Sequence, residues 1–169
     1  MSQQIITFEA IGVIHSPHQE QAGAPIQPYA ARGISGTIEV FPEYREGLAD
    51  LRGFDRIWLL YWFHRTASCR LRVIPFRDVV ERGLFSTRAP CRPNPIGLSA
   101  VGLIEVDEAG GLLKIEDVDM LDGTPLLDIK PYVPQFDAYP DAKAGWLDSS
   151  EKLRDYADGR FEDRAEEGS

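Results

Sequence analysis

Several features that would place this chain of 169 residues in a familiar class are absent from its sequence. The N-terminus has no basic segment followed by an apolar run, so we expect no signal peptide. The longest apolar run, residues 57–63, is far too short to cross a bilayer. Neither the phosphate-binding patterns GxGxxG and GxxxxGK nor the hydrolase pattern GxSxG occurs. These absences argue against a membrane protein, a Rossmann dinucleotide enzyme, a P-loop enzyme and an α/β-hydrolase.

Cysteine and histidine are scarce as well. The two cysteines, Cys69 and Cys91, lack CxxC spacing, which suits reduced thiols in a cytoplasmic protein. The three histidines are His15, His18 and His64, and no further ligand pattern accompanies the first two. We therefore expect no metal ion. His64, at the end of an apolar run, is either a ligand contact or a core histidine.

The charges that are present are unevenly distributed. Apolar residues make up 43% of the chain and charged residues 27%, as in one compact soluble domain. The net charge of -9 argues against a nucleic-acid partner, yet residues 52–92 contain nine arginines and three acidic residues. This stretch predicts a cationic surface for an anionic ligand, unless acidic neighbours balance the arginines in the folded protein.

The most concentrated motif is residues 86–99, which read STRAPCRPNPIGLS. Its three prolines fix φ and remove backbone donors, so they exclude a helix and a central strand. A loop this restricted loses little entropy when it binds a ligand. It presents Arg88, Arg92 and Asn94, and arginine grips carboxylates and phosphates through paired hydrogen bonds. The loop is either a rigid crossover or a binding site, and its arginines favour the site.

A second motif, residues 119–132, reads DMLDGTPLLDIKPY. Asp-Gly and Thr-Pro predict a tight turn, so the backbone of residues 124–127 is placed to face a ligand. Asp128 and Lys130 share one face of the following strand and are expected to pair. A turn and an ion pair alone would also explain most of this motif.

The spacing of apolar residues predicts mainly strands. The apolar run at 56–63 suggests burial on both faces, and 98–106 with 112–119 suggests an antiparallel hairpin. A terminal helix is expected to begin near Asp148, with Glu151 completing a capping box. We therefore expect an antiparallel β-barrel with a few short helices in residues 1–147, followed by a C-terminal helix and acidic tail in residues 148–169. Further strands are expected at 5–14, 34–40 and 125–130, a loop at 16–33 and a short helix at 42–51.

Both motifs resemble signature stretches of the TsaA-like family, the TrmO-type tRNA adenine-N6 methyltransferases. They read FSTRAPCRPNPIGLSAV and DMLDGTPLLDIKPY, and IGVIHSP, PIQP and GLADLRGFDRIWLLYWFH fit the same pattern in the same order. The resemblance runs from about Phe8 to Asp137. Longer members carry an additional C-terminal domain, so here the arginine-rich stretch is expected to form the RNA-binding surface, doubled across a dimer.

The resemblance implies a β-barrel methyltransferase, unlike the Rossmann-type enzymes, that is cytoplasmic and binds S-adenosylmethionine near a homodimer interface. The implied reaction methylates N6 of threonylcarbamoyladenosine next to the anticodon of tRNA. The implied cofactor contacts are Gln27, Pro28, Tyr29, Phe63, His64, Arg88, Leu98, Thr124, Pro125, Leu126 and Leu127.

Elementary chemistry suits this assignment. The cofactor carries a carboxylate for Arg88, which is predicted as a catalytic residue as well as a cofactor contact. The acceptor nitrogen must lose a proton, for which Asp128 is the predicted catalytic base. A pairing with Lys130 would lower that basicity. Arg92, Asn94 and Lys130 are predicted to contact the substrate. Two other functions stay open here: methylation of another nucleotide or small molecule, and non-enzymatic RNA binding.

Overall fold

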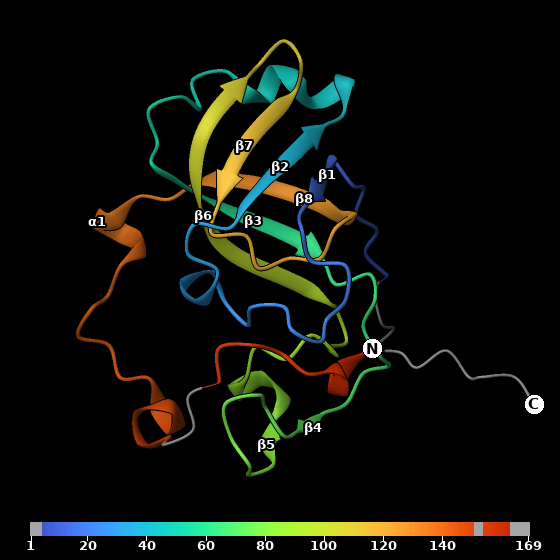
Figure 1. The fold of residues 1–169 in the computed structure, drawn as a ribbon, viewed down its shortest axis with the longest axis vertical. Helices are drawn as coiled ribbons and strands as arrows, with labels where there is room; N and C mark the ends of the chain where they lie inside the picture. The colour runs from blue at the N-terminus through green and yellow to red at the C-terminus, as the bar shows by residue number, and fades with distance from the viewer. Residues whose placement is uncertain (1–4, 151–153, 163–169) are drawn as a thin grey trace, which may run out of the picture.

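The fold is a closed barrel of six strands, given by a computed structural model that describes residues 5–150 and 154–162 (Figure 1). The strand order is β1-β2-β7-β6-β3-β8, and every neighbouring pair is antiparallel, which confirms the expected barrel. The strands are β1 (Gly12–His15), β2 (Ser35–Val40), β3 (Arg56–Trp62), β6 (Ile96–Asp107), β7 (Leu112–Glu116) and β8 (Thr124–Pro131).

The remaining elements are short and lie outside the barrel wall. Between β3 and β6 the chain forms an excursion that contains the small sheet β4 (Arg72–Val73) and β5 (Arg82–Gly83). The one described α-helix is α1 (Pro134–Asp137). The described 3₁₀ turns are η1 (Pro28–Ala30), η2 (Pro42–Leu48), η3 (Leu84–Ser86), η4 (Gly145–Ser149) and η5 (Gly159–Phe161).

Burial alternates along β3, which differs from the expectation that both of its faces are buried. Ile57, Leu59 and Tyr61 point into the barrel core, whereas Trp62 is 47% exposed. The reason is the closed antiparallel barrel, because only its inner face packs against other strands. A continuous apolar run therefore does not distinguish this strand from one covered on both sides.

Antiparallel closure brings six strand ends together at one end of the barrel, which we call the loop end. The loop 16–34 and the excursion both leave from it and lie below the barrel in the view of Figure 1. The opposite end is covered by η2 and the residues after it, whose Leu48 and Leu51 join the core. At the loop end, β1 ends at His15, β3 at Trp62 and β7 at Glu116, while β2, β6 and β8 begin at Ser35, Ile96 and Thr124.

A second, smaller core lies under the excursion. Val73, Leu84, Ala89 and Cys91 form it, and Phe161 from the C-terminal segment completes it. Both cysteines are free thiols, as expected.

The expected C-terminal helix is wrong for the described residues. Asp148 accepts a hydrogen bond from the Ala144 amide and so closes the short turn η4. Arg154 to Asp158 form no helix, and Tyr156 bridges to Pro25. Pairing with the loop at 23–26 satisfies this backbone in place of a helix. Glu151 and Leu153, expected to form part of the helix, lie outside the described residues.

Candidate functional site

The proline-rich loop is braced by its own side chains at the loop end of the barrel. The Thr87 hydroxyl donates to the Leu84 carbonyl at 2.8 Å, and Arg92 Nη1 donates to the carbonyls of Thr87 and Ala89 at 3.0 and 3.2 Å. The Phe63 amide donates to the Pro95 carbonyl at 2.8 Å and fixes the loop to the end of β3. Arg92, predicted as a substrate contact, therefore has a structural task, whereas Asn94 is exposed.

Arg88 leaves this loop and meets the loop at 16–34. Its Nη1 donates to Gln27 Oε1 at 2.5 Å, and Gln27 Nε2 donates to the Ile26 carbonyl at 2.8 Å, which holds the amide in this orientation. Among the described residues no carboxylate pairs with Arg88, so its guanidinium faces a neutral partner. The fold thus brings together two residues predicted to bind the cofactor that are 61 positions apart in sequence. The charge of Arg88 is not neutralised by this partner and is available to bind an anion.

A second arginine, Arg77, packs against Tyr29 of the same loop. The Arg77 guanidinium lies 5.4 Å above the Tyr29 ring, and the Tyr29 hydroxyl donates to Asp155 Oδ1 at 2.5 Å. Desolvation and this hydrogen bond raise the pKa of Tyr29, while the charge of Arg77 opposes them. Arg77 Nε is buried without a hydrogen-bond partner among the described residues. No spacing of residues in the sequence predicts this contact.

A buried polar chain runs from the barrel interior toward Arg88. The Tyr61 hydroxyl and Ser99 Oγ lie 3.0 Å apart, and Ser99 Oγ donates to Asp119 Oδ1 at 2.8 Å. Because the single hydroxyl proton of Ser99 is donated to Asp119, the Tyr61 hydroxyl must be the donor in its hydrogen bond with Ser99. Gly97 makes room for this arrangement, since a Cβ there would lie 2.2 Å from the Tyr61 ring.

Asp119 is the functional candidate that sequence reasoning missed. Desolvation raises the pKa of its carboxyl to about 7, although the Ser99 hydrogen bond and the charge of Arg88 favour the ionised form. Part of the residue still reaches solvent. Its sequence context, between two apolar residues ahead of a turn, does not distinguish it from an acid that only shapes the turn.

The end of β3 links this polar chain to two predicted cofactor contacts. Phe63 packs edge-on against Tyr61 with ring centroids 5.3 Å apart, and His64 lies 6.4 Å from Trp62. Desolvation lowers the pKa of His64, and the nearby charge of Arg65 lowers it further against an opposing backbone hydrogen bond. His64 is therefore neutral at pH 7.

The predicted contacts on β8 divide between the two faces of the barrel. The Leu126 side chain is fully buried in the core, and Thr124 donates its hydroxyl to the Leu121 carbonyl at 2.7 Å. These two side chains are therefore not available to a ligand, and only the backbone of residues 124–127 can contact one. Pro125 and Leu127 are half-buried.

Asp128 and Leu98 share a row on the outer face, because both pair with Leu60 of β3. Leu98 is 46% exposed. Asp128 Oδ2 lies 2.7 Å from Lys130 Nζ, which confirms the expected pairing. The chain places the predicted base in an ion pair on this outer face, while Asp119 lies toward the barrel interior.

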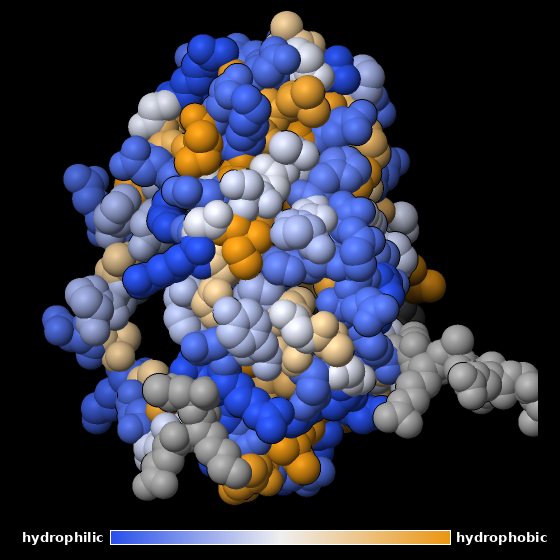
Figure 2. Space-filling model, in the orientation of Figure 1, coloured by the Kyte–Doolittle hydropathy of each residue, from blue (hydrophilic) through white to orange (hydrophobic). Residues whose placement is uncertain are grey.

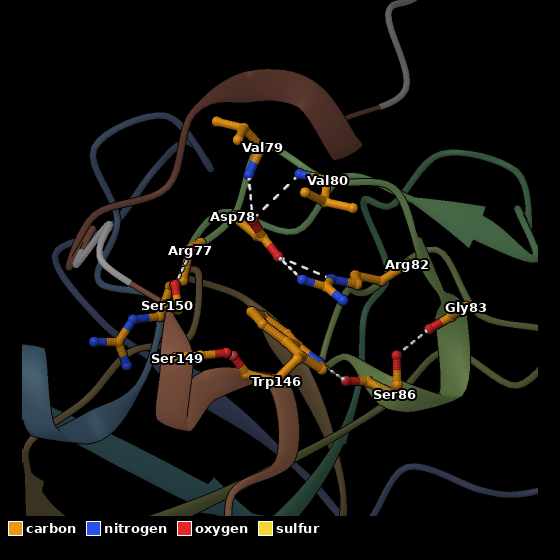
Figure 3. Close-up of polar contacts among 10 residues, drawn as sticks. All are labelled: Arg77, Asp78, Val79, Val80, Arg82, Gly83, Ser86, Trp146, Ser149 and Ser150. Carbon is orange, nitrogen blue, oxygen red and sulfur yellow. Dashed lines mark hydrogen bonds and ion pairs between the residues drawn. The ribbon is translucent and has the colours of Figure 1, made fainter.

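The C-terminal segment fastens the excursion from outside (Figure 3). Trp146 Nε1 donates to the Ser86 carbonyl at 2.8 Å, and the Arg82 guanidinium lies 5.1 Å from the Trp146 ring. Ser150 Oγ donates to the Arg77 carbonyl at 2.6 Å. These contacts hold the backbone at Arg77 and at Ser86, the first residue of the proline-rich loop, so residues 146–150 help to position the site.

The arginines of residues 52–92 separate into two groups. Four of them pair with carboxylates and are Arg52, Arg56, Arg72 and Arg82. The other five have no carboxylate partner within residues 5–150 and 154–162, and they are Arg65, Arg70, Arg77, Arg88 and Arg92. All five belong to the segment between β3 and β6, at the loop end, so a cationic surface persists there after the paired charges are removed.

A hollow of about 570 Å³ lies beside this site, between the β4–β5 sheet and the C-terminal segment. It includes Arg72, Arg154 and Arg160, which are engaged with Glu81 and Asp158. None of the predicted cofactor contacts lines it, so we assign the site from the contacts of Arg88 and Asp119 rather than from this hollow.

Two further tests bear on the class of protein. Within the described part of the chain, no helix is long and apolar enough to span a membrane. No cluster of three or more potential metal ligands occurs among those same residues. His15 lies 3.5 Å from Asp122, whereas His18 donates to the Val118 carbonyl.

Comparison with known proteins agrees with the barrel fold. Residues 13–138 match the family model described as tRNA-methyltransferase O N-terminal domain. The chain belongs to this family. It is 52% identical to a probable S-adenosyl-L-methionine-binding protein of Pyrococcus abyssi, covering 93% of this chain and 85% of the relative.

Two relatives carry the name of a tRNA methyltransferase. The tRNA (adenine(37)-N6)-methyltransferase of Escherichia coli is 39% identical and matches 85% of this chain. This chain spans 64% of that enzyme, and 31% of the human protein of the same name. The crystal structure of TrmO from Pseudomonas aeruginosa matches with a TM-score of 0.70 at 38% identity, covering 84% of this chain and 62% of that one.

Asp119 makes the stability of the fold depend on pH. The folded protein holds this proton up to about pH 7, whereas the ordinary value is 3.8. The folded state therefore binds more protons between these values, and the contribution of Asp119 to the free energy of unfolding falls as pH rises through this window.

Asp119→Asn keeps an acceptor for Ser99 but removes the titration. We expect its stability relative to wild type to rise by a few kcal/mol, to order of magnitude, between about pH 4 and pH 8. Urea unfolding of both proteins across this range measures the difference. A difference that stays constant with pH would contradict the assignment.

Proposed function

We propose that this protein is an S-adenosylmethionine-dependent methyltransferase acting on N6 of threonylcarbamoyladenosine next to the anticodon of tRNA. Family membership and the names of its bacterial and human relatives support the reaction class. The observation that carries the proposal is Arg88, a guanidinium with a neutral partner, held between two braced loops beside a buried carboxyl.

The residues at the loop end fit the cofactor chemically. Its carboxylate suits Arg88, which is free to exchange Gln27 for an anion. Its adenine suits the exposed apolar surface of Trp62 and Leu98 and the half-buried Phe63. When bound, the cofactor supplies a methyl group on a positively charged sulfur, a good leaving group.

Positioning and water exclusion are the tasks left to the protein. The prolines, Arg92 and the Trp146 contact hold the Arg88 loop in one conformation, so little freedom is lost on binding. Methyl transfer depends on in-line placement of the two reacting atoms, for which such rigidity is the main protein contribution. The cofactor contacts predicted at 27–29, 63–64 and 124–127 border this loop end.

The substrate RNA is accommodated by the arginines of the excursion. Arg65, Arg70 and Arg77 have no carboxylate partner among the described residues and lie on the same end as Arg88. Phosphate contacts by arginine release counterions, so binding will weaken steeply with salt despite the net charge of -9. Asn94 is exposed beside them, and Lys130 lies on the outer face with Asp128.

We also infer a homodimer in the cytoplasm. Apolar side chains gather at the foot of the molecule over β4 and β5, bordered by hydrophilic residues (Figure 2). Leu71, Val79 and Phe85 are 63%, 62% and 74% exposed there. A second copy would cover this surface and double the arginine-rich face. Two unpaired thiols suit a reducing compartment.

The dimer is tested by sedimentation velocity. We expect a species of twice 18.9 kDa for the wild type, and dissociation in Leu71→Glu because a charge then enters the apolar surface. Ile104→Glu is the matched control, since Ile104 is 59% exposed on the barrel, away from β4 and β5. A monomer in the wild type, or dissociation in the control alone, would reject this interface.

The reaction is tested by mass analysis of tRNA digests. After incubation with S-adenosylmethionine, threonylcarbamoylated tRNA is expected to gain one methyl group on the modified adenosine. No gain on this tRNA, with methylation of another nucleotide or a small molecule, would replace the proposed substrate. RNA binding without any saturable binding of S-adenosylmethionine would identify a non-enzymatic module.

Arg88→Ala is expected to weaken S-adenosylmethionine binding by about 1–3 kcal/mol, the scale of a lost charge-assisted hydrogen bond. Isothermal titration calorimetry measures the change. Arg52→Ala, at the opposite end of the barrel and paired with Glu108, is the control and should bind as the wild type does. Equal affinity of wild type and Arg88→Ala would remove Arg88 from the site.

A further inference from the structure

We propose that Asp119 is the group that accepts the proton from the adenine N6 nitrogen during methyl transfer, held in place by Ser99 and Tyr61. This inference rests on the proposed function. It gives the proton-accepting role to Asp119, whereas the sequence predicted Asp128 for that role. It is carried by the position of this carboxylate at the loop end and by its contacts.

Three elements converge to fix the Asp119 carboxylate. Ser99 from β6 donates to Oδ1 at 2.8 Å, and Tyr61 from β3 lies 3.0 Å behind Ser99. Arg88, from the proline-rich loop, is close enough for its charge to favour the ionised form. No described side chain donates to Oδ2, so this oxygen is left for a substrate.

Ser99 and Tyr61 connect Asp119 to the predicted cofactor contacts. Tyr61 touches Ser99 on one side and packs against Phe63 on the other. Arg88 connects the same region to Gln27. These contacts and the charge of Arg88 connect the carboxylate to the residues predicted to hold the methyl donor, near which an acceptor nitrogen must approach.

The neighbouring carboxylates are already engaged. Asp128 pairs with Lys130 at 2.7 Å on the outer face, and Asp117 pairs with Arg56 and accepts from the Gly33 amide. Asp122 accepts from the Ser16 amide, and its pKa is lowered. Asp119 differs, because desolvation raises the pKa of its carboxyl to about 7, the value that suits a proton acceptor at pH 7.

The transfer balances with Asp119 as the acceptor. The ionised carboxylate takes the N6 proton through Oδ2, and the electron pair of that N–H bond stays on nitrogen. Nitrogen forms the new bond to the methyl carbon as the carbon–sulfur bond breaks, and the electron pair of that bond neutralises the sulfur. Asp119 then releases its proton to solvent through its partly exposed surface.

The test compares Asp119→Asn with wild type in single-turnover methyl transfer to threonylcarbamoylated tRNA and in calorimetric binding of S-adenosylmethionine. We expect the rate to fall by at least about 100-fold, the lower range for a lost general base, while the dissociation constant changes less than about threefold. The wild-type rate should rise with pH and level off above about 7. The variant should lack this rise.

Two further variants separate proton transfer from structural support. Ser99→Ala removes a hydrogen bond that favours the carboxylate, so the midpoint of the pH profile should move to higher pH. Glu105→Gln is the matched carboxyl-to-amide control, since Glu105 is exposed and pairs with Lys114 on the barrel wall. It should leave rate, affinity and pH profile unchanged.

Each other outcome overturns a defined part of the account. A wild-type rate or pH profile in Asp119→Asn, or loss of the rate in Asp128→Asn instead, rejects Asp119 as the acceptor. A dissociation constant raised more than about tenfold in Asp119→Asn makes the residue a binding group rather than the acceptor. No methyl transfer by wild type rejects the proposed function and the inference with it.

Discussion

The pairing of β1 with β8 is the constraint on which the rest of this structure depends. The first and last strands of the barrel meet with Gly12 opposite Leu126, and the Ile11 amide donates to the Leu126 carbonyl at 2.8 Å. On its other side β1 pairs with β2, and Gly12 permits that close approach because a Cβ there would clash with the Glu39 carbonyl oxygen of β2. The pairing of β1 with β8 fixes the position at which the loop 16–34 leaves the barrel.

Closure joins loops from distant parts of the chain. The Ser16 amide donates to Asp122 and the Asp122 amide to the His18 carbonyl, so the first long loop is tied to the turn before β8. The same loop receives the C-terminal segment through Ala157 and Asp155. A site assembled in this way is rigid before it binds anything, and it keeps a carboxyl in a desolvated place where its ionisation lowers stability.

Local patterns in the sequence predicted what local physics decides. The prolines predicted the irregular loop, alternation predicted the hairpin of β6 and β7, and the spacing of Asp128 and Lys130 predicted their pairing. The role of Asp119 depends on desolvation by residues from other strands, and the position of Arg77 over Tyr29 depends on tertiary packing. No local pattern encodes such contacts.

The C-terminal segment shows the same limit, because its helical pattern gives way to pairing with the loop at 23–26. The prolines and arginines of residues 86–99 located the loop that carries Arg88, yet they did not indicate that Arg92 braces that loop from within. The sequence did not predict which polar side chains form structural hydrogen bonds within the fold and which are available to a ligand.

The most direct test of the account is a crystal structure of the protein with S-adenosylhomocysteine, the product left after methyl transfer. The account predicts that the ligand carboxylate lies within hydrogen-bond reach of the Arg88 guanidinium, with the sulfur facing the Asp119 carboxyl. A ligand bound in the hollow beside β4 and β5, with Arg88 still on Gln27, would contradict it.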